Sequence, residues 1–130
     1  MLQAKQLTFA DLEFNVQTDK EHFTPKQSMK GCSQEEIDNF CDAVKEVLEK
    51  ADGAWGWCCV KVTGVLKDDI KFNNVEYLGC CSYLSEADFM TPGGYYDDMC
   101  KTVLISVQWQ LDLHVRLINE SIEKGTIYVV

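Results

Sequence analysis

The run between Val103 and Leu117 constrains the fold of this chain more than any other feature of its sequence. Every second residue in it is apolar, which is the pattern of a β-strand with one buried face. A strand across this run would be about 50 Å long, whereas a domain of this size has a radius of gyration of only about 14 Å. The same residues occupy about 22 Å as a helix. The length therefore predicts a helix, from about residue 96 to residue 123.

The ends of this long helix carry matching signals. Asp97 and Asp98 fall in its first turn and Gly125 follows its last turn, where acidic residues and glycine respectively are favoured. The helix is apolar nearly all round, so more than one side needs a cover. Two stripes point to different sides: Leu104, Val107, Leu111 and Ile118 form one, and Ile105, Trp109 and Leu113 form the other. We expect one stripe to pack on a sheet and the other to need either the first helix or a second chain, which would make the protein a homodimer.

A second helix is predicted over residues 34–51. Ser33-Gln34-Glu35-Glu36 has the pattern of a capping box, in which Ser33 and Glu36 satisfy each other's free amide groups. Gly53 lies where a helix-ending glycine is common. Apolar residues at steps of three and four form one stripe along the helix: Ile37, Phe40, Cys41, Val44, Val47, Leu48 and Ala51.

Two strands are predicted between the helices, at Ala54–Leu66 and Phe72–Leu84, because residues that favour β-structure dominate both runs. A turn centred between Asp69 and Ile70 places Cys58 opposite Cys81 and Cys59 opposite Cys80. Residues 126–130 are expected to add a closing strand, and Ser85 to cap a single helical turn.

Residues 1–32 are expected to be largely irregular, with a short strand at Glu13–Val16. The whole pattern indicates one domain, residues 1–130, of the α+β class. Its predicted core is a small antiparallel β-sheet with two main helices packed on it.

The charge balance restricts the partners. Twenty-one acidic residues face twelve basic ones, the net charge is -9, and Arg116 is the single arginine. Nucleic-acid binding depends on basic side chains that release counterions, and phosphate recognition relies on guanidinium groups. We therefore expect no nucleic-acid or anionic-membrane binding and a basic protein as partner.

The seven cysteines and two histidines indicate neither a metal site nor a catalytic site. Adjacent cysteines in a strand point to opposite faces, so Cys58-Cys59 and Cys80-Cys81 do not suit one zinc ion. His22 and His114 have no local catalytic signature. An odd cysteine count without a signal peptide predicts reduced, buried thiols in the cytoplasm. We expect a protein without cofactor or metal that is not an enzyme.

A glycine-rich loop at Gly93–Asp98 opens the long helix, a position where phosphate can bind. Asp97 and Asp98 would repel a phosphate there, and no lysine of the Walker type follows. The pattern therefore predicts a turn followed by an acid-capped helix.

Candidate partner-binding residues fall into two groups. Acidic residues lie at steps of three and four on the first predicted helix, away from its apolar stripe: Glu35, Asp38, Asp42, Glu46 and Glu49. Such a row is typical of a solvated face, and it also suits docking on a basic groove. Aromatic residues in the second half of the chain offer anchors of the kind that interfaces favour; we select Tyr83, Phe89, Tyr95 and Tyr96, with Tyr77 and Trp109 as further candidates.

Two segments, Tyr77-Leu78-Gly79-Cys80-Cys81-Ser82-Tyr83 and the region ending in Gly94-Tyr95-Tyr96-Asp97-Asp98-Met99, resemble parts of small proteins of phages and other mobile elements. Many small acidic proteins from that source inhibit host defence, as anti-CRISPR and anti-restriction proteins do. The resemblance covers about a fifth of the chain and implies an inhibitor without assigning a role to any residue.

These observations favour a small acidic inhibitor that binds a basic, nucleic-acid-binding surface of a host defence protein. Two alternatives remain from the same features. One is an immunity protein that neutralises a basic toxin, and the other is a small-ligand-binding module that uses the aromatic loop.

Overall fold

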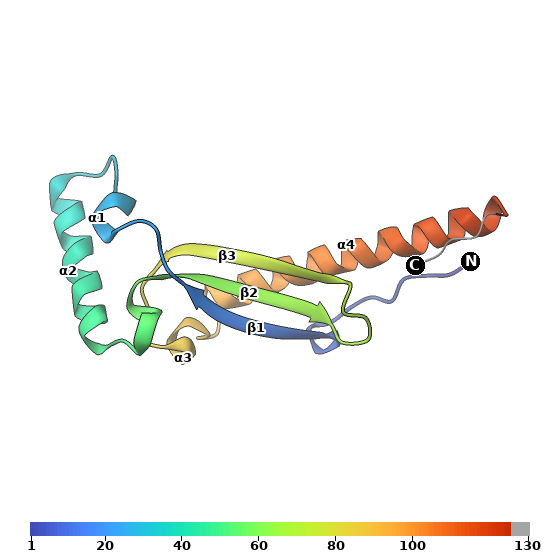
Figure 1. Cartoon of the computed structure of the whole chain (residues 1–130), viewed down its shortest axis with the longest axis horizontal. Coiled ribbons are helices and arrows are strands. Elements are labelled where there is room, and N and C mark those ends of the chain that lie inside the picture. The colour runs from blue at the N-terminus through green and yellow to red at the C-terminus, as the bar shows by residue number, and fades with distance from the viewer. Residues whose placement is uncertain (126–130) are drawn as a thin grey trace.

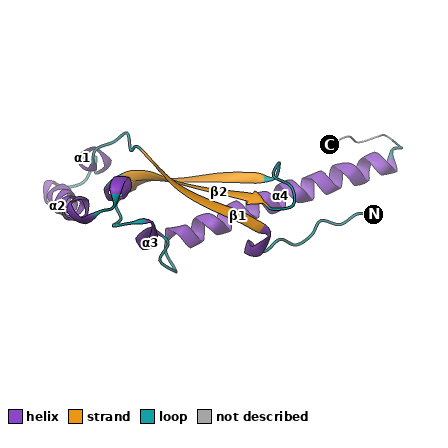
Figure 2. Cartoon of the chain, turned by 60° about the horizontal axis from the view of Figure 1, so that its bottom comes forward, coloured by secondary structure: helices purple, strands orange, loops and turns teal. Residues whose placement is uncertain are grey.

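The computed structural model describes residues 1–125, which form an elongated molecule built on a three-stranded antiparallel sheet (Figure 1). The strands β1 (Leu12–Asp19), β2 (Cys58–Leu66) and β3 (Asn73–Cys81) lie in that order. Helix α4 (Tyr95–Glu123) runs along one face of the sheet, and no other described element covers the opposite face (Figure 2). The predicted α+β class with a small antiparallel sheet is confirmed. The closing strand expected at residues 126–130 lies outside the described residues.

The central strand β2 alternates strictly between buried and half-buried residues along its whole length. Its buried set, which includes Cys58, Val60 and Val62, faces α4. Gly64 belongs to the same set, and a Cβ atom there would collide with the side chain of Val103 on α4. The glycine therefore lets the helix lie close to the sheet, which is the usual reason for a glycine inside a strand.

The hairpin of β2 and β3 has the predicted register only where Cys58 faces Cys81. From Val60 to Val65 the pairing is shifted by one residue, so the turn predicted between Asp69 and Ile70 is wrong. Cys58 pairs with Cys81 as expected, but Val60 pairs with Leu78, so two residues of β3 oppose Cys59. This β-bulge contains Cys80, whose φ of 56° is unusual for a residue other than glycine. Cys59 and Cys80 therefore do not form the expected pair, because Cys80 lies in the bulge.

The N-terminal segment is more regular than the sequence indicates. The short strand expected at Glu13–Val16 is eight residues long and pairs with all but the first residue of β2, from Leu12 opposite Leu66 to Asp19 opposite Cys59. A 3-10 turn, η1 (Phe9–Asp11), precedes it, and a short helix, α1 (Pro25–Ser28), follows it. The strand pairs with a segment about fifty residues away, so no local pattern could show its full extent.

Helix α4 agrees with the helix predicted from residue 96 to residue 123. It buries Met99, Cys100, Val103 and Val107 against the sheet. Of the expected stripe that contains Leu104, Val107 and Leu111, only Val107 is fully buried, and the other two pack half buried beside it. At 1.5 Å per residue it is about 43 Å long, and its C-terminal half extends past the end of the sheet (Figure 1). Within the described residues, none of the helices is long and apolar enough to cross a membrane.

Helix α2 (Gln34–Lys50) begins and ends within one residue of the prediction. The Ser33 hydroxyl accepts a hydrogen bond from the Glu36 amide at 3.2 Å and donates one to the Glu36 carboxylate at 2.9 Å, which closes the first turn. The helix lies beyond the end of the sheet rather than on its face (Figure 1). It packs there on α1 and on the 3-10 turn η2 (Gly53–Gly56), which replaces the start of the strand expected at Ala54.

Candidate partner-binding surface

The acidic residues chosen from the sequence form one continuous exposed face on α2. Each of the five carboxylates is exposed, and together they line the side of the helix opposite its apolar stripe: Glu35, Asp38, Asp42, Glu46 and Glu49. The whole helix carries six acidic residues and two lysines. It therefore holds a large part of the net charge of -9 in a single element.

These carboxylates have no ionic partners among the described residues. The three ion pairs within residues 1–125 join Lys5 to Asp11, Lys71 to Asp69, and Arg116 to Glu120, and none involves α2. The side-chain amide of Gln34 donates to the Asp38 carboxylate at 2.8 Å. Because Gln34 is uncharged, this bond does not cancel the charge of Asp38. Like charges three and four residues apart on a helix are destabilising by a few tenths of a kcal/mol per pair, roughly. The row thus carries a small cost in stability, which Lys45 and Lys50 offset in part because they lie three or four residues from its members, and the helix keeps a net negative charge that faces the solvent.

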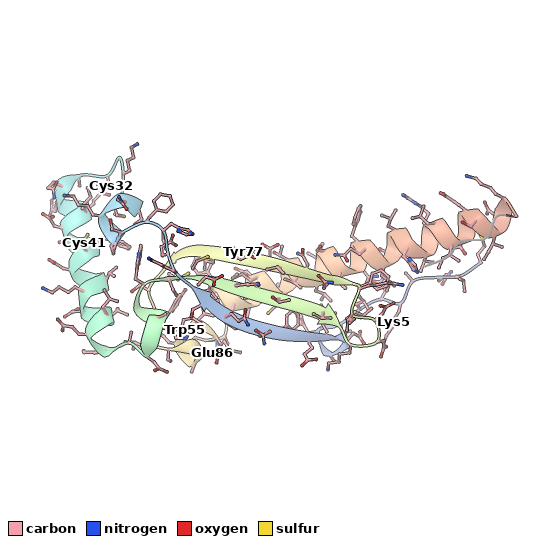
Figure 3. The ribbon with its side chains drawn as sticks, in the orientation of Figure 1. Lys5, Cys32, Cys41, Trp55, Tyr77 and Glu86 are labelled. Carbon is pink, nitrogen blue, oxygen red and sulfur yellow. The ribbon has the colours of Figure 1, made fainter. Side chains whose placement is uncertain are left out.

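The attachment of α2 to the rest of the molecule is thin. Val44 is its only buried residue, and Phe40 lies edge-on to the ring of Trp57 with 6.0 Å between ring centres. Leu48 contacts the backbone of η2 at Gly56 but is still 50% exposed. Figure 3 shows the side chains of α2 projecting into solvent at one end of the molecule, with Cys41 on this helix. The helix therefore presents charge on one side and an incompletely covered apolar stripe on the other.

The aromatic residues selected as anchors are mostly part of the core, and this corrects the sequence interpretation. Phe89, on the short helix α3 (Glu86–Phe89), is 1% exposed. The rings of Trp55, Tyr83 and Tyr96 surround it at 5.5, 5.2 and 5.9 Å between ring centres. These rings pack on one another and so join η2, α3 and the start of α4 to the sheet. They do not form an exposed aromatic loop.

Burial has a chemical consequence for two of these tyrosines. It raises the pKa of Tyr83, and it raises the pKa of Tyr96 to about 12, to which the hydrogen bond between Tyr96 and Cys100 also contributes. Both hydroxyls therefore stay protonated at neutral pH. Of the four selected aromatic residues, Tyr95 alone is well exposed, at 59%.

Neither histidine lies beside the buried pair of Cys58 and Cys81, although His22 and Cys59 line one surface hollow together with Glu21. Cys58 and Cys81 are buried where β2 begins and β3 ends. His114 lies at the opposite end of the sheet, edge-on to Phe72 with 5.3 Å between ring centres. His22 is exposed in the loop after β1. No group of three or more His, Cys, Asp or Glu side chains in residues 1–125 is arranged to hold a metal ion.

The expectation of buried thiols holds for Cys58, Cys81 and Cys100 and is wrong for Cys32 and Cys80, which are exposed. Cys80 is exposed because it lies in the bulge. Its amide donates to the Glu21 carboxylate at 2.6 Å, a charge-assisted hydrogen bond that offsets part of the backbone strain. This bond is the main reason that the pKa of Glu21 is lowered. Burial and the same carboxylate raise the pKa of the Cys80 thiol. A thiol of raised pKa is a poor nucleophile at neutral pH, so Cys80 lacks the features of a reactive cysteine.

The thiols lead to a prediction on pH. Burial raises the pKa of Cys58 to about 11 and that of Cys81 to about 12, from the ordinary value of 9.0 that applies in the unfolded chain. The unfolded chain therefore loses these protons first as pH rises. We expect the free energy of unfolding to be insensitive to these groups below pH 9 and to fall from there toward pH 12. Urea unfolding between pH 7 and pH 11 in the presence of reductant measures this slope.

The matched control for this slope is the double variant Cys58→Ala and Cys81→Ala. It should be less stable at every pH because it loses buried side chains. Its stability should also fall less steeply above pH 9. An unchanged slope would assign the alkaline sensitivity to other groups, such as Tyr96.

The glycine loop before α4 has the arrangement expected for an acid-capped helix. The Asp97 carboxylate accepts a hydrogen bond from the amide of Gly93 at 2.7 Å, and Gly93 has a positive φ of 83°. This bond holds the negative charge of Asp97 near the first turn of α4, where it would repel a phosphate.

Comparisons with protein-family models, with curated proteins and with solved structures give no match to this chain. Its sequence and geometry are therefore the only basis for a functional proposal.

Most of the exposed large apolar side chains in the described residues were not among the four selected anchors. Tyr77, 60% exposed, lies on β3 (Figure 3), and Trp109, 64% exposed, lies on α4; the sequence offered both as further anchors. Leu48 was assigned to the buried stripe of α2, and no local signal marks it as half exposed. Its exposure depends on how little of α2 the rest of the molecule covers, which is a property of the tertiary fold.

Proposed function

We propose that this chain is a small acidic binding protein that inhibits its partner by docking on a basic surface through α2. The observation that carries the proposal is the row of five exposed carboxylates on α2, none of which has an ionic partner within residues 1–125. A row of negative charge on a rod resembles the phosphate backbone of a nucleic acid in its electrostatic effect. The partner surface is therefore one that normally holds nucleic acid.

The position of α2 also supports this role. The helix lies at one end of the molecule, where it can enter a groove without a clash between the sheet and the walls of that groove (Figure 1). Its half-covered residues, such as Leu48, lie on the other side of the helix, where they offer apolar contact to a groove that surrounds α2. Charged rims speed association and apolar contacts slow dissociation, so the two features together suit a stable inhibitor.

The resemblance of Tyr77–Tyr83 and of the segment ending at Met99 to parts of mobile-element proteins favours a host defence protein as the target. Binding alone accounts for inhibition in this proposal, so no catalytic group is required. The acidic α2 face would occupy the basic groove and exclude the nucleic acid by competition.

Competition with nucleic acid provides the test of this proposal. The immobilised chain is exposed to a nuclease-treated extract of bacteria that carry restriction and CRISPR systems. We expect it to retain a basic nucleic-acid-binding protein, and added duplex DNA should release that protein because both bind the same surface. Retained proteins that are not basic, or a basic protein that DNA does not displace, would refute the proposal.

A further inference from the structure

The outer face of α4 carries an exposed apolar ridge. Ile105 is 70% exposed, Trp109 64% and Leu117 36%, while Leu113 between them is half buried. These four residues follow one another at steps of four, which places them on a single ridge of the helix surface. We call Ile105, Trp109, Leu113 and Leu117 the α4 ridge.

No other described element covers the α4 ridge. The sheet lies against the side of α4 that carries Val103 and Val107. The N-terminal segment lies along another side, where Gln108 and Asn119 bind its backbone: the Gln108 side chain bonds Leu7 and Lys5, and the Asn119 side chain bonds Leu2. Helix α2 lies at the far end of the sheet (Figure 1). We expected either the first helix or a second chain to cover the stripe that contains Ile105, Trp109 and Leu113. Helix α2 of the same chain does not cover it.

The charges around the α4 ridge differ from those of the rest of the chain. From Asp98 to Lys124, the stretch that spans the charges used below, the chain has three basic and four acidic residues, whereas the whole chain has a net charge of -9. A basic partner would gain little from this nearly balanced surface, and a second copy would be repelled by it only weakly. The occupant that fits both the apolar side chains and the nearly balanced charge is another copy of the same face.

We propose that two copies of this protein pair through the α4 ridge in antiparallel orientation, about a two-fold axis near the level of Leu111. This axis places Ile105 of one copy opposite Leu117 of the other and Trp109 opposite Leu113. We place the two helices at the shallow crossing of about 20° found in helix bundles, because the crossing of about 50° at which two ridges of residues four apart interdigitate would separate the helix ends. A two-fold axis also repeats every contact, so each residue of the ridge is used twice.

The flanking charges select the antiparallel orientation. The same axis brings Asp98 opposite Lys124 of the second copy and Lys101 close to Glu120, and all four side chains are exposed. A parallel pair with the helices in step would instead face Asp98 with Asp98 and Glu120 with Glu120. Opposite charges therefore meet in one orientation and like charges in the other, and this difference suppresses the wrong arrangement.

The antiparallel pair has a geometric consequence. Each α2 lies beyond the N-terminal end of its own α4 (Figure 1). An antiparallel dimer therefore carries its two acidic helices at opposite ends. The dimer does not depend on what α2 binds, and its tests do not use a partner.

Light scattering and sedimentation of the full chain test the dimer. We expect a mass of two 14.8 kDa chains that falls to one on dilution. Trp109→Asp should raise the dimer dissociation constant by about 30-fold or more, as expected for a central aromatic residue that each interface uses twice. The matched control is Tyr77→Asp, because Tyr77 is equally exposed but lies on β3. It should leave the dissociation constant unchanged, and circular dichroism confirms that both variants fold.

A charge exchange tests the orientation. Asp98→Lys alone and Lys124→Asp alone should each weaken the dimer, and the double variant should restore it because the pairs are exchanged rather than removed. A single-chain mass at every concentration would overturn the proposal, as would a dimer that Tyr77→Asp disrupts and Trp109→Asp does not. If Trp109→Asp dissociates the dimer but the double variant does not restore it, the antiparallel register is wrong. If Trp109→Asp fails to fold, Ile105→Ser replaces it, with the same expectation.

Discussion

Replacing Phe89 with alanine is expected to lower the free energy of unfolding by about 3–5 kcal/mol, the usual range for a large buried aromatic residue. Phe89 is 1% exposed and its ring contacts those of Trp55, Tyr83 and Tyr96. Removing it leaves a cavity among three rings that are held in place by separate elements, so the site cannot collapse easily. Urea unfolding monitored by tryptophan fluorescence and by circular dichroism measures the loss.

The matched control is Tyr95→Ala, which removes a similar ring six residues away. Tyr95 is 59% exposed, so we expect a change within about 0.5 kcal/mol. Equal losses in the two variants would mean that Phe89 does not hold α3 and the start of α4 to the sheet. In that case the aromatic residues would return as candidates for a binding surface.

The two long helices could be predicted because their signals are local. The Ser33 cap, the apolar stripe and Gly53 all lie within or beside α2, and the choice of a helix for α4 followed from its length alone. These features need no knowledge of distant parts of the chain. The pairing of Cys58 with Cys81 agrees with the prediction only because the bulge offsets a one-residue shift in the rest of the hairpin, so the predicted turn does not account for it.

The features that could not be predicted depend on contacts between distant residues. The full length of β1 depends on β2, and the bulge at Cys80 depends in part on the carboxylate of Glu21, fifty-nine residues away. Phe89 and Tyr95 look alike in the sequence, but Phe89 at the end of α3 lies in the core, whereas Tyr95 at the start of α4 is exposed to solvent. The acidic face of α2 was recognised because exposure on a helix follows from the position of its apolar stripe.

Reversing three charges on α2 is expected to slow association with the basic partner by about 10-fold to 1,000-fold, the range over which electrostatic steering acts. Asp42, Glu46 and Glu49 suit this change because they are exposed, make no hydrogen bonds and lie after the first turn. Substitution of all three by lysine should leave the fold intact, since surface changes usually cost little stability. Circular dichroism checks the fold, and surface plasmon resonance on the captured partner measures the rate.

The association rate of this variant against a matched control tests the role of α2 most directly. The control reverses Glu13, Asp19 and Asp68, which are equally exposed but lie on β1 and in the turn after β2, and it changes the net charge by the same amount. We predict that the α2 variant associates much more slowly than the control at low salt, and that the gap narrows as salt screens the exposed charges. Equal rates for the two variants at every salt concentration would contradict a specific role for α2 and leave only the overall charge of the protein.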